Sequence, residues 1–253
     1  MSSFQNTKLR NPPIVEAVFD VDCDLPPGFD LASLEVPIRA RFADQYPKFQ
    51  TQFLQTFAIN AGTDSAPNMS THRTVQAFQC RHEDEKQLVQ LRAQGFSFNR
   101  LAPYTSLDDY LPEIERTWRL YVELASPIHI RIIRLRFINR IFLPMAAGKV
   151  DLDEFLKLGP RMPDEENLRL CSFLTQQVAI EKNTGHELNL VLTAEAPVDE
   201  KLPAILDITV ASATITEPTD WPNMLQAIEK LRSLKNHAFF NTLTPECIDL
   251  FQS

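Results

Sequence analysis

The chain has 253 residues, of which 44% are hydrophobic and 23% are charged, and its formal net charge is -8 at pH 7. Such a composition is typical of a globular protein that buries a sizeable core, and the acidic balance disfavours non-specific binding of polyanions. Four well-separated cysteines without a C-x-x-C pair, and only six glycines, indicate no zinc site, redox motif or glycine-rich phosphate loop, so we expect no cofactor.

The stretch before Asn11 is polar and lacks the apolar segment of a signal peptide. Elsewhere no apolar run approaches the length of a membrane span. Together with the cysteine pattern, these features predict a reduced cytoplasmic protein without a membrane partner.

Strand and turn signals alternate in the next part of the chain. Strands are predicted at 14–23, 49–59 and 96–101, with a hairpin formed by 73–82 and 86–93 around an acidic turn. Between the first two strands, Asp30 is expected to cap a helix through about residue 46, which Pro37 breaks or restarts.

A second helix is predicted to begin at Ser106 and to end before Pro127. Tyr110, Trp118 and Tyr121 lie on one face of this helix. Because they recur at helical spacing, we interpret them as core residues and not as a stacking platform.

The strand Ile128–Pro144 follows and carries a basic face. Its apolar residues change phase at Ile132–Ile133, where a β-bulge would keep all of them on the core side. The opposite face would then carry Arg131, Arg134, Arg136 and Arg140.

Beyond this strand, the pattern predicts a short helix at 151–158 and three strands at 168–182, 187–196 and 205–216. A long helix at 221–241 and a last helical turn from Thr244 complete the chain.

The order of elements looks alike in the two halves, 1–127 and 128–253, since each runs strand, helix, several strands and a long helix. We therefore predict an α+β fold in which two similar halves form one compact unit. It would have a broad antiparallel sheet with long helices on one face. By analogy the closest architecture is the saddle of the TATA-binding protein, and a helix-grip fold is the alternative.

Four guanidinium groups on one sheet face require anions nearby. Such anions are available within the chain, because Glu16, Asp20 and Asp22 share a face of the first strand and Asp207 lies in a later strand. An internal ladder of ion pairs is therefore favoured over an external anionic ligand, since structural ion pairs are common.

Three blocks, NPPIVEA at 11–17, FSFNRLAPY at 96–104 and LRFINRI at 135–141, resemble a sporadically distributed bacterial family of unknown function and similar length. Leu243-Thr244 and Phe251 extend the likeness to nearly the whole chain. The resemblance implies a compact bacterial cytoplasmic protein and, from the scattered distribution, a mobile or defence-associated gene neighbourhood. It implies no catalytic residue. The motif positions are candidates for a shared site: Glu16, Asn99, Arg100, Tyr104, Arg136, Asn139 and Arg140.

No nucleophile, metal or nucleotide motif marks an enzyme, and the five histidines lie in separate elements. We therefore favour a non-enzymatic binding or regulatory protein that holds an acidic protein surface or a nucleic acid on the arginine face. One alternative is an enzyme acting on a small anionic substrate at the same face, with Glu16 as base. Another is a structural subunit whose arginines are all paired internally. A homodimer, formed through a sheet edge or the C-terminal helix, is the expected oligomer.

Overall fold

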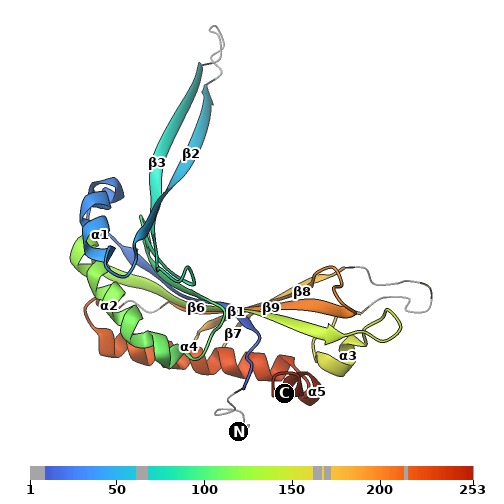
Figure 1. The fold of residues 1–253 in the computed structure, drawn as a ribbon. Helices are drawn as coiled ribbons and strands as arrows, with labels where there is room; N and C mark the ends of the chain where they lie inside the picture. Colours follow the sequence, from blue (N-terminus) through green and yellow to red (C-terminus); the bar gives the residue numbers. More distant parts are fainter. Residues whose placement is uncertain (1–8, 61–67, 162–166, 168–171, 214–215, 253) are drawn as a thin grey trace.

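The computed structural model describes residues 9–60, 68–161, 167, 172–213 and 216–252. Its strands form a nine-stranded sheet in the order β2-β3-β4-β5-β1-β6-β9-β8-β7, and all neighbouring strands are antiparallel (Figure 1). The strands are β1 (Ile14–Asp24), β2 (Lys48–Asn60), β3 (Asn68–Arg81), β4 (Gln87–Arg92), β5 (Gly95–Leu101), β6 (His129–Pro144), β7 (Leu174–Ile180), β8 (Glu187–Ala194) and β9 (Lys201–Ser212). The helical elements are η2 (Leu31–Leu34), α1 (Glu35–Phe42), α2 (Leu107–Ala125), α3 (Leu152–Phe155), α4 (Trp221–Thr242) and α5 (Pro245–Asp249).

The strand β1 lies at the centre of the sheet, since it pairs with β5 on one side and with β6 on the other. Its residues alternate between buried and half-buried, as the period-two pattern predicts. Gly95 permits the close approach of β5, because a Cβ atom there would lie 1.9 Å from the carbonyl oxygen of Val21. The following residue, Phe96, packs edge-on against Trp118 of α2 and so fixes this helix on the sheet.

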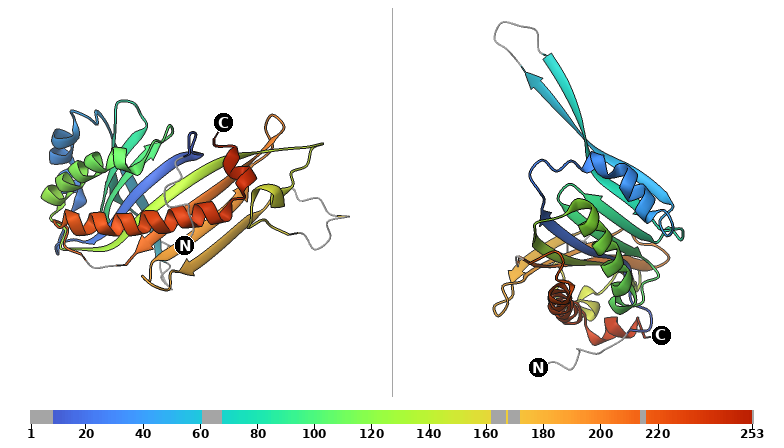
Figure 2. Two further views of the ribbon diagram at one scale, coloured as in Figure 1. Left: turned by 90° about the horizontal axis from the view of Figure 1, so that it is seen from below. Right: turned by 90° about the vertical axis from the view of Figure 1, so that its left-hand side faces the viewer.

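The two longer helices contribute most of the helical core. In α2, Trp118 and Tyr121 are buried, which confirms their interpretation as core residues. The helix α4 crosses β6 and β9 (Figure 2) and buries Met224, Ile228 and Leu231 against them. This crossing determines which side chains of β6 face a helix.

The predicted fold class is wrong. Three of the five α-helices in the described residues have eight residues or fewer, and no layer of long helices covers one face. The halves also differ, because in the part of the chain that the structure describes five strands precede residue 127 and four follow it. The segment expected to form one helix from Asp30 is a 3-10 turn followed by α1. Pro37 lies in the first turn of α1, where a missing backbone N–H costs little, so the helix begins anew there. Neither the saddle nor the helix-grip description is retained.

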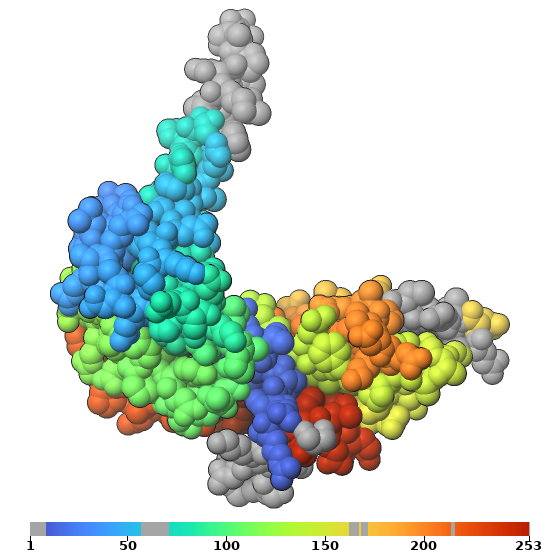
Figure 3. Space-filling view, in the orientation of Figure 1, coloured from blue at the N-terminus to red at the C-terminus, as the bar shows by residue number. Residues whose placement is uncertain are grey.

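The hairpin of β2 and β3 leaves the body of the molecule as a two-stranded arm (Figures 1 and 3). Its register shifts between Gln52 and Phe53, where the arm departs from the sheet. The side chains of Phe53 and Leu54 are exposed, and the guanidinium of Arg73 stacks 3.5 Å above the Phe53 ring. Strand pairing and local stacking therefore hold the arm, with little help from the core.

Thr244 joins the C-terminal turn to α3. Its hydroxyl accepts a hydrogen bond from the Cys247 backbone N–H and donates one to the carbonyl of Glu154 at 2.6 Å. The variant Thr244→Ala is expected to lower the free energy of unfolding by about 1–2 kcal/mol, measured by urea denaturation. Thr244→Ser keeps the hydroxyl and should lose less than half as much. Equal losses in both variants would assign the effect to the methyl group.

Candidate functional site

The predicted arginine strand is β6, and its phase from Ile133 onward is as expected, whereas Ile132, predicted on the core side, lies opposite Asp22 on the arginine face. The register between β1 and β6 shifts between Asp22 and Cys23, which places the bulge at Arg131, one residue before the predicted pair Ile132–Ile133. The core side of the strand carries the buried residues Ile130, Ile133, Leu135, Phe137 and Ile141. The four arginines consequently lie on the opposite face.

Each of these arginines is paired with a carboxylate of the same chain. Arg134 lies between Asp20, at 2.9 Å, and Asp22, at 2.7 Å. Arg136 holds Asp207 with hydrogen bonds from two guanidinium nitrogens, the shorter being 2.6 Å. The outer pairs are Arg131 with Asp24 at 3.2 Å and Arg140 with Glu195 at 2.5 Å. The internal ladder is therefore the arrangement that the chain adopts.

Hydrogen bonds to the carboxylates stabilise the charged form of Arg134 and Arg136 in this ladder. Burial lowers the pKa of Arg134, but the hydrogen bonds to Asp22 and Asp20 outweigh that effect and raise it. The hydrogen bond to Asp207 likewise raises the pKa of Arg136. An incoming anion would have to displace a carboxylate already in place, so these arginines do not offer free cations within the described part of the chain.

Glu16 and Asn99 lie on the arginine side of the sheet in local polar contacts. Glu16 accepts a hydrogen bond from the Asn99 amide at 2.7 Å instead of pairing with an arginine of β6. Arg100 lies on the helix side, opposite Ala17 of β1, with its guanidinium 5.2 Å from the centre of the Tyr110 ring. Arg100 pairs with Asp84 at 2.9 Å. These contacts connect β1, β5 and the turn before β4, and they give each of the three side chains a partner, although Nε of Arg100 is buried without a hydrogen bond.

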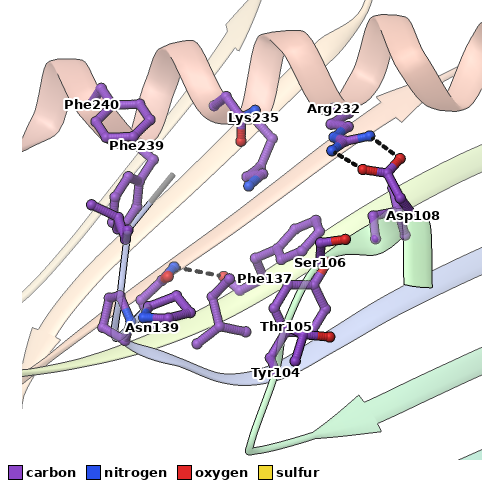
Figure 4. A pocket seen from close by; sticks show the side chains of 16 residues that line it. Tyr104, Thr105, Ser106, Asp108, Phe137, Asn139, Arg232, Lys235, Phe239 and Phe240 are labelled. Atoms are coloured by element: carbon purple, nitrogen blue, oxygen red, sulfur yellow. Dashed lines mark hydrogen bonds and ion pairs between the residues drawn. The ribbon is translucent and has the colours of Figure 1, made fainter. Parts of the chain in front are cut away.

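Tyr104 and Asn139 are separated from the arginines of β6 and lie on the side of the sheet that faces α4 (Figure 4). Asn139 is buried, and its amide donates to the carbonyls of Phe137 at 3.2 Å and Leu206 at 2.9 Å. The ring of Tyr104 packs edge-on against Phe137, and burial raises the pKa of its hydroxyl. The predicted site residues thus divide between two faces of the sheet.

A cavity of about 310 Å³ lies beside Tyr104 and Asn139, between α4 and the sheet. One wall is the segment Pro12–Pro13, which precedes β1. The loop after β5 and the ring of Phe137 on β6 form the floor, and α4 closes the other side (Figure 4). A cavity of this size, with mixed apolar and polar walls, is suited to a small organic ligand.

Lys235 enters this cavity from α4 (Figure 4). Its Nζ lies 4.1 Å from the centre of the Phe137 ring. Burial and, to a smaller extent, the neighbouring Arg232 lower the pKa of the amine to about 7. No carboxylate of the described residues forms an ion pair with this amine, so the cavity contains an amine without a counter-ion.

Arg232, about one turn before Lys235, is already neutralised. Its guanidinium makes two hydrogen bonds to the carboxylate of Asp108, at 2.6 and 2.7 Å. The pair ties α4 to the first turn of α2 at one end of the cavity. Because Asp108 is engaged in this way, the charge of Lys235 is left for a ligand to compensate.

The three sequence blocks that carry the family resemblance meet at this cavity. The first block supplies Pro12 and Pro13, the second supplies Tyr104, and the third supplies Phe137 and Asn139. Backbone hydrogen bonds hold the blocks together, since the Arg140 N–H donates to the Pro13 carbonyl at 2.8 Å. Segments far apart in the sequence therefore build one site.

The sequence alone did not mark Lys235 as a site residue, because lysine side chains in helices usually point into solvent. A signal was nevertheless present, since Lys235 lies four residues after Leu231 and four residues before Phe239. Both of these residues are large and apolar, and residues four apart share one face of the predicted helix 221–241. A lysine on an apolar stripe is the pattern that could have found the site.

Among the described residues, no cluster of histidine, cysteine, aspartate or glutamate is arranged to hold a metal ion, and no helix has the length and apolar character needed to cross a bilayer. Comparisons with protein-family models, with curated proteins and with solved structures give no match. Function is therefore argued from the cavity alone.

Proposed function

We propose that this chain is a binding protein of the bacterial cytoplasm that holds a small acidic molecule in the cavity beneath α4. The observation that carries the proposal is the amine of Lys235, which lies in a cavity of ligand size without a counter-ion. A carboxylate or phosphate placed beside the amine would favour its charged form and supply the missing partner. The rings of Phe137 and Tyr104 would cover the apolar part of the ligand.

This proposal keeps the anionic ligand class expected from the sequence and moves it from the arginine face to the opposite side of the sheet. The arginines already hold carboxylates, whereas Lys235 does not. A binding role is preferred to an enzymatic one, because no nucleophile–base pair accompanies the amine in the described part of the cavity wall.

The test is isothermal titration calorimetry of the full chain with a panel of small aliphatic and aromatic carboxylates, each beside its neutral amide. At pH 6.5 at least one carboxylate should bind tenfold or more tightly than its amide. Its affinity should fall as the pH rises above 7, because the amine must be protonated to pair with the anion. No preference for any carboxylate over its amide would overturn the proposal.

Matched variants locate the site. Lys235→Met should abolish the preference for the carboxylate, and Lys235→Arg, which retains a positive charge, should keep most of it. Arg136→Met is the control on the opposite face and should bind as the wild type does. If Arg136→Met lost binding and Lys235→Met did not, the anion site would lie on the arginine face.

A further inference from the structure

We propose that Lys235 captures its ligand covalently, by forming an imine with the aldehyde or keto group of a small carbonyl acid. The inference deepens the proposed function and rests on it, since the same cavity and the same amine are used. It adds a chemical class of ligand, a carbonyl compound that also carries an acidic group.

The surroundings of Lys235 favour the neutral amine that imine formation requires. No carboxylate of the described residues forms an ion pair with the amine, and Arg232 on the same helix, although paired with Asp108, still lowers its pKa. The nearest acid that lines the cavity, Asp108, is held by Arg232. Burial beside another cation and away from a free carboxylate is the arrangement that activates nucleophilic lysines. The lowered pKa of the amine, about 7, agrees with this geometry.

Lys230 on the same helix shows how different this environment is. Its side chain is exposed, and it does not line the cavity. It shares the helix with Lys235 but not the cavity, which makes Lys230 a matched internal control.

The reaction needs no oxidant and no reductant. The Nζ lone pair attacks the carbonyl carbon and forms a C–N bond, while the C=O π electrons move to oxygen, which takes up a proton. Transfer of a proton from nitrogen and loss of water then give the imine, which is protonated beside the acidic group of the ligand. The cavity is also lined by Ser106, whose hydroxyl is able to donate a hydrogen bond to that acidic group.

The experiment uses glyoxylate, which combines an aldehyde with a carboxylate, and sodium cyanoborohydride to trap the imine on the full chain at pH 7.5. Peptide mapping by mass spectrometry follows modification of each lysine over time. Lys235 should be modified at least tenfold faster than Lys230, and the preference should be smaller with propanal, which meets the same activated amine but lacks the carboxylate. Equal rates at Lys235 and Lys230 would overturn the inference.

The variant Lys235→Arg distinguishes this failure from failure of the proposed function. It should bind non-reactive carboxylates and show no fast-reacting lysine. If carboxylates bind to the wild type at the Lys235 site but Lys235 is trapped no faster than Lys230, the imine inference is rejected and the binding function stands. If carboxylates show no preference over their amides, the binding function is rejected as well.

Discussion

Replacing Lys235 with methionine is expected to stabilise the ligand-free protein. The folded chain holds this amine in a cavity that lowers its pKa to about 7, whereas the unfolded chain leaves it near the ordinary lysine value. Between these two pKa values the unfolded state binds more protons, so the stability of the wild type rises with pH across this interval. Below pH 7 the full cost of holding the charged amine is present.

The variant should therefore gain about 1–2 kcal/mol in free energy of unfolding at pH 6.5 and clearly less at pH 9.5. Urea denaturation of both proteins at the two pH values measures the difference. Lys230→Met, on an exposed position of the same helix, should change stability little at either pH. A gain for Lys235→Met that is equal at both pH values would show that added apolar packing, and not the buried charge, is responsible. Loss of ligand binding together with a gain in stability would be typical of a functional site.

The second large effect is expected at Arg134. Replacement by methionine leaves Asp20 and Asp22, both mostly buried, with Arg92 as their remaining partner at 2.7 and 3.4 Å. Two carboxylates that share one cation repel each other and are poorly solvated, so the loss in free energy of unfolding should be about 2–4 kcal/mol. Chemical denaturation monitored by circular dichroism checks this value.

The control is Arg131→Met, since Arg131 and its partner Asp24 are both about half exposed. This variant should lose less than about 1 kcal/mol. Adding Asp22→Asn to Arg134→Met should recover part of the larger loss, because one of the two competing charges is removed. Equal losses at Arg131 and Arg134 would contradict the central place of Arg134 in the ladder.

The period-two pattern was sufficient to predict most strands of this fold. The alternation in 128–144 placed β6 and its arginine face, and the first strand offered Glu16, Asp20 and Asp22 as candidate anions, of which Asp20 and Asp22 bind Arg134. Local patterns are reliable here because each face of a strand has one environment. Homology, oligomeric state and macromolecular partners remain predictions.

The fold class and the cavity could not be predicted from the period-two pattern of the sequence. Element order does not reveal that helices such as α1 and α3 are short, and Pro37 allowed both a broken and a continuous helix. The cavity is lined by segments that are far apart in the sequence, such as Pro13 and α4, which begins more than two hundred residues later. The half-buried position of Lys235 is a property of that tertiary arrangement, and its place on the apolar stripe of α4 was the one local sign.

The central position of β1 has a consequence for synthesis on the ribosome. The strand β1 is translated first, yet its partner β6 begins at His129, which takes roughly 5–20 s longer to appear at ordinary elongation rates. During this interval β5 can already pair with β1, while the other edge of β1 is open. Asp20 and Asp22 stand on that edge, and Arg92 of β4 is available to hold them before Arg134 exists. Charged residues on an open edge discourage pairing with strands of other chains. The carboxylates that later bind the arginines of the ladder therefore first protect the incomplete sheet from such pairing.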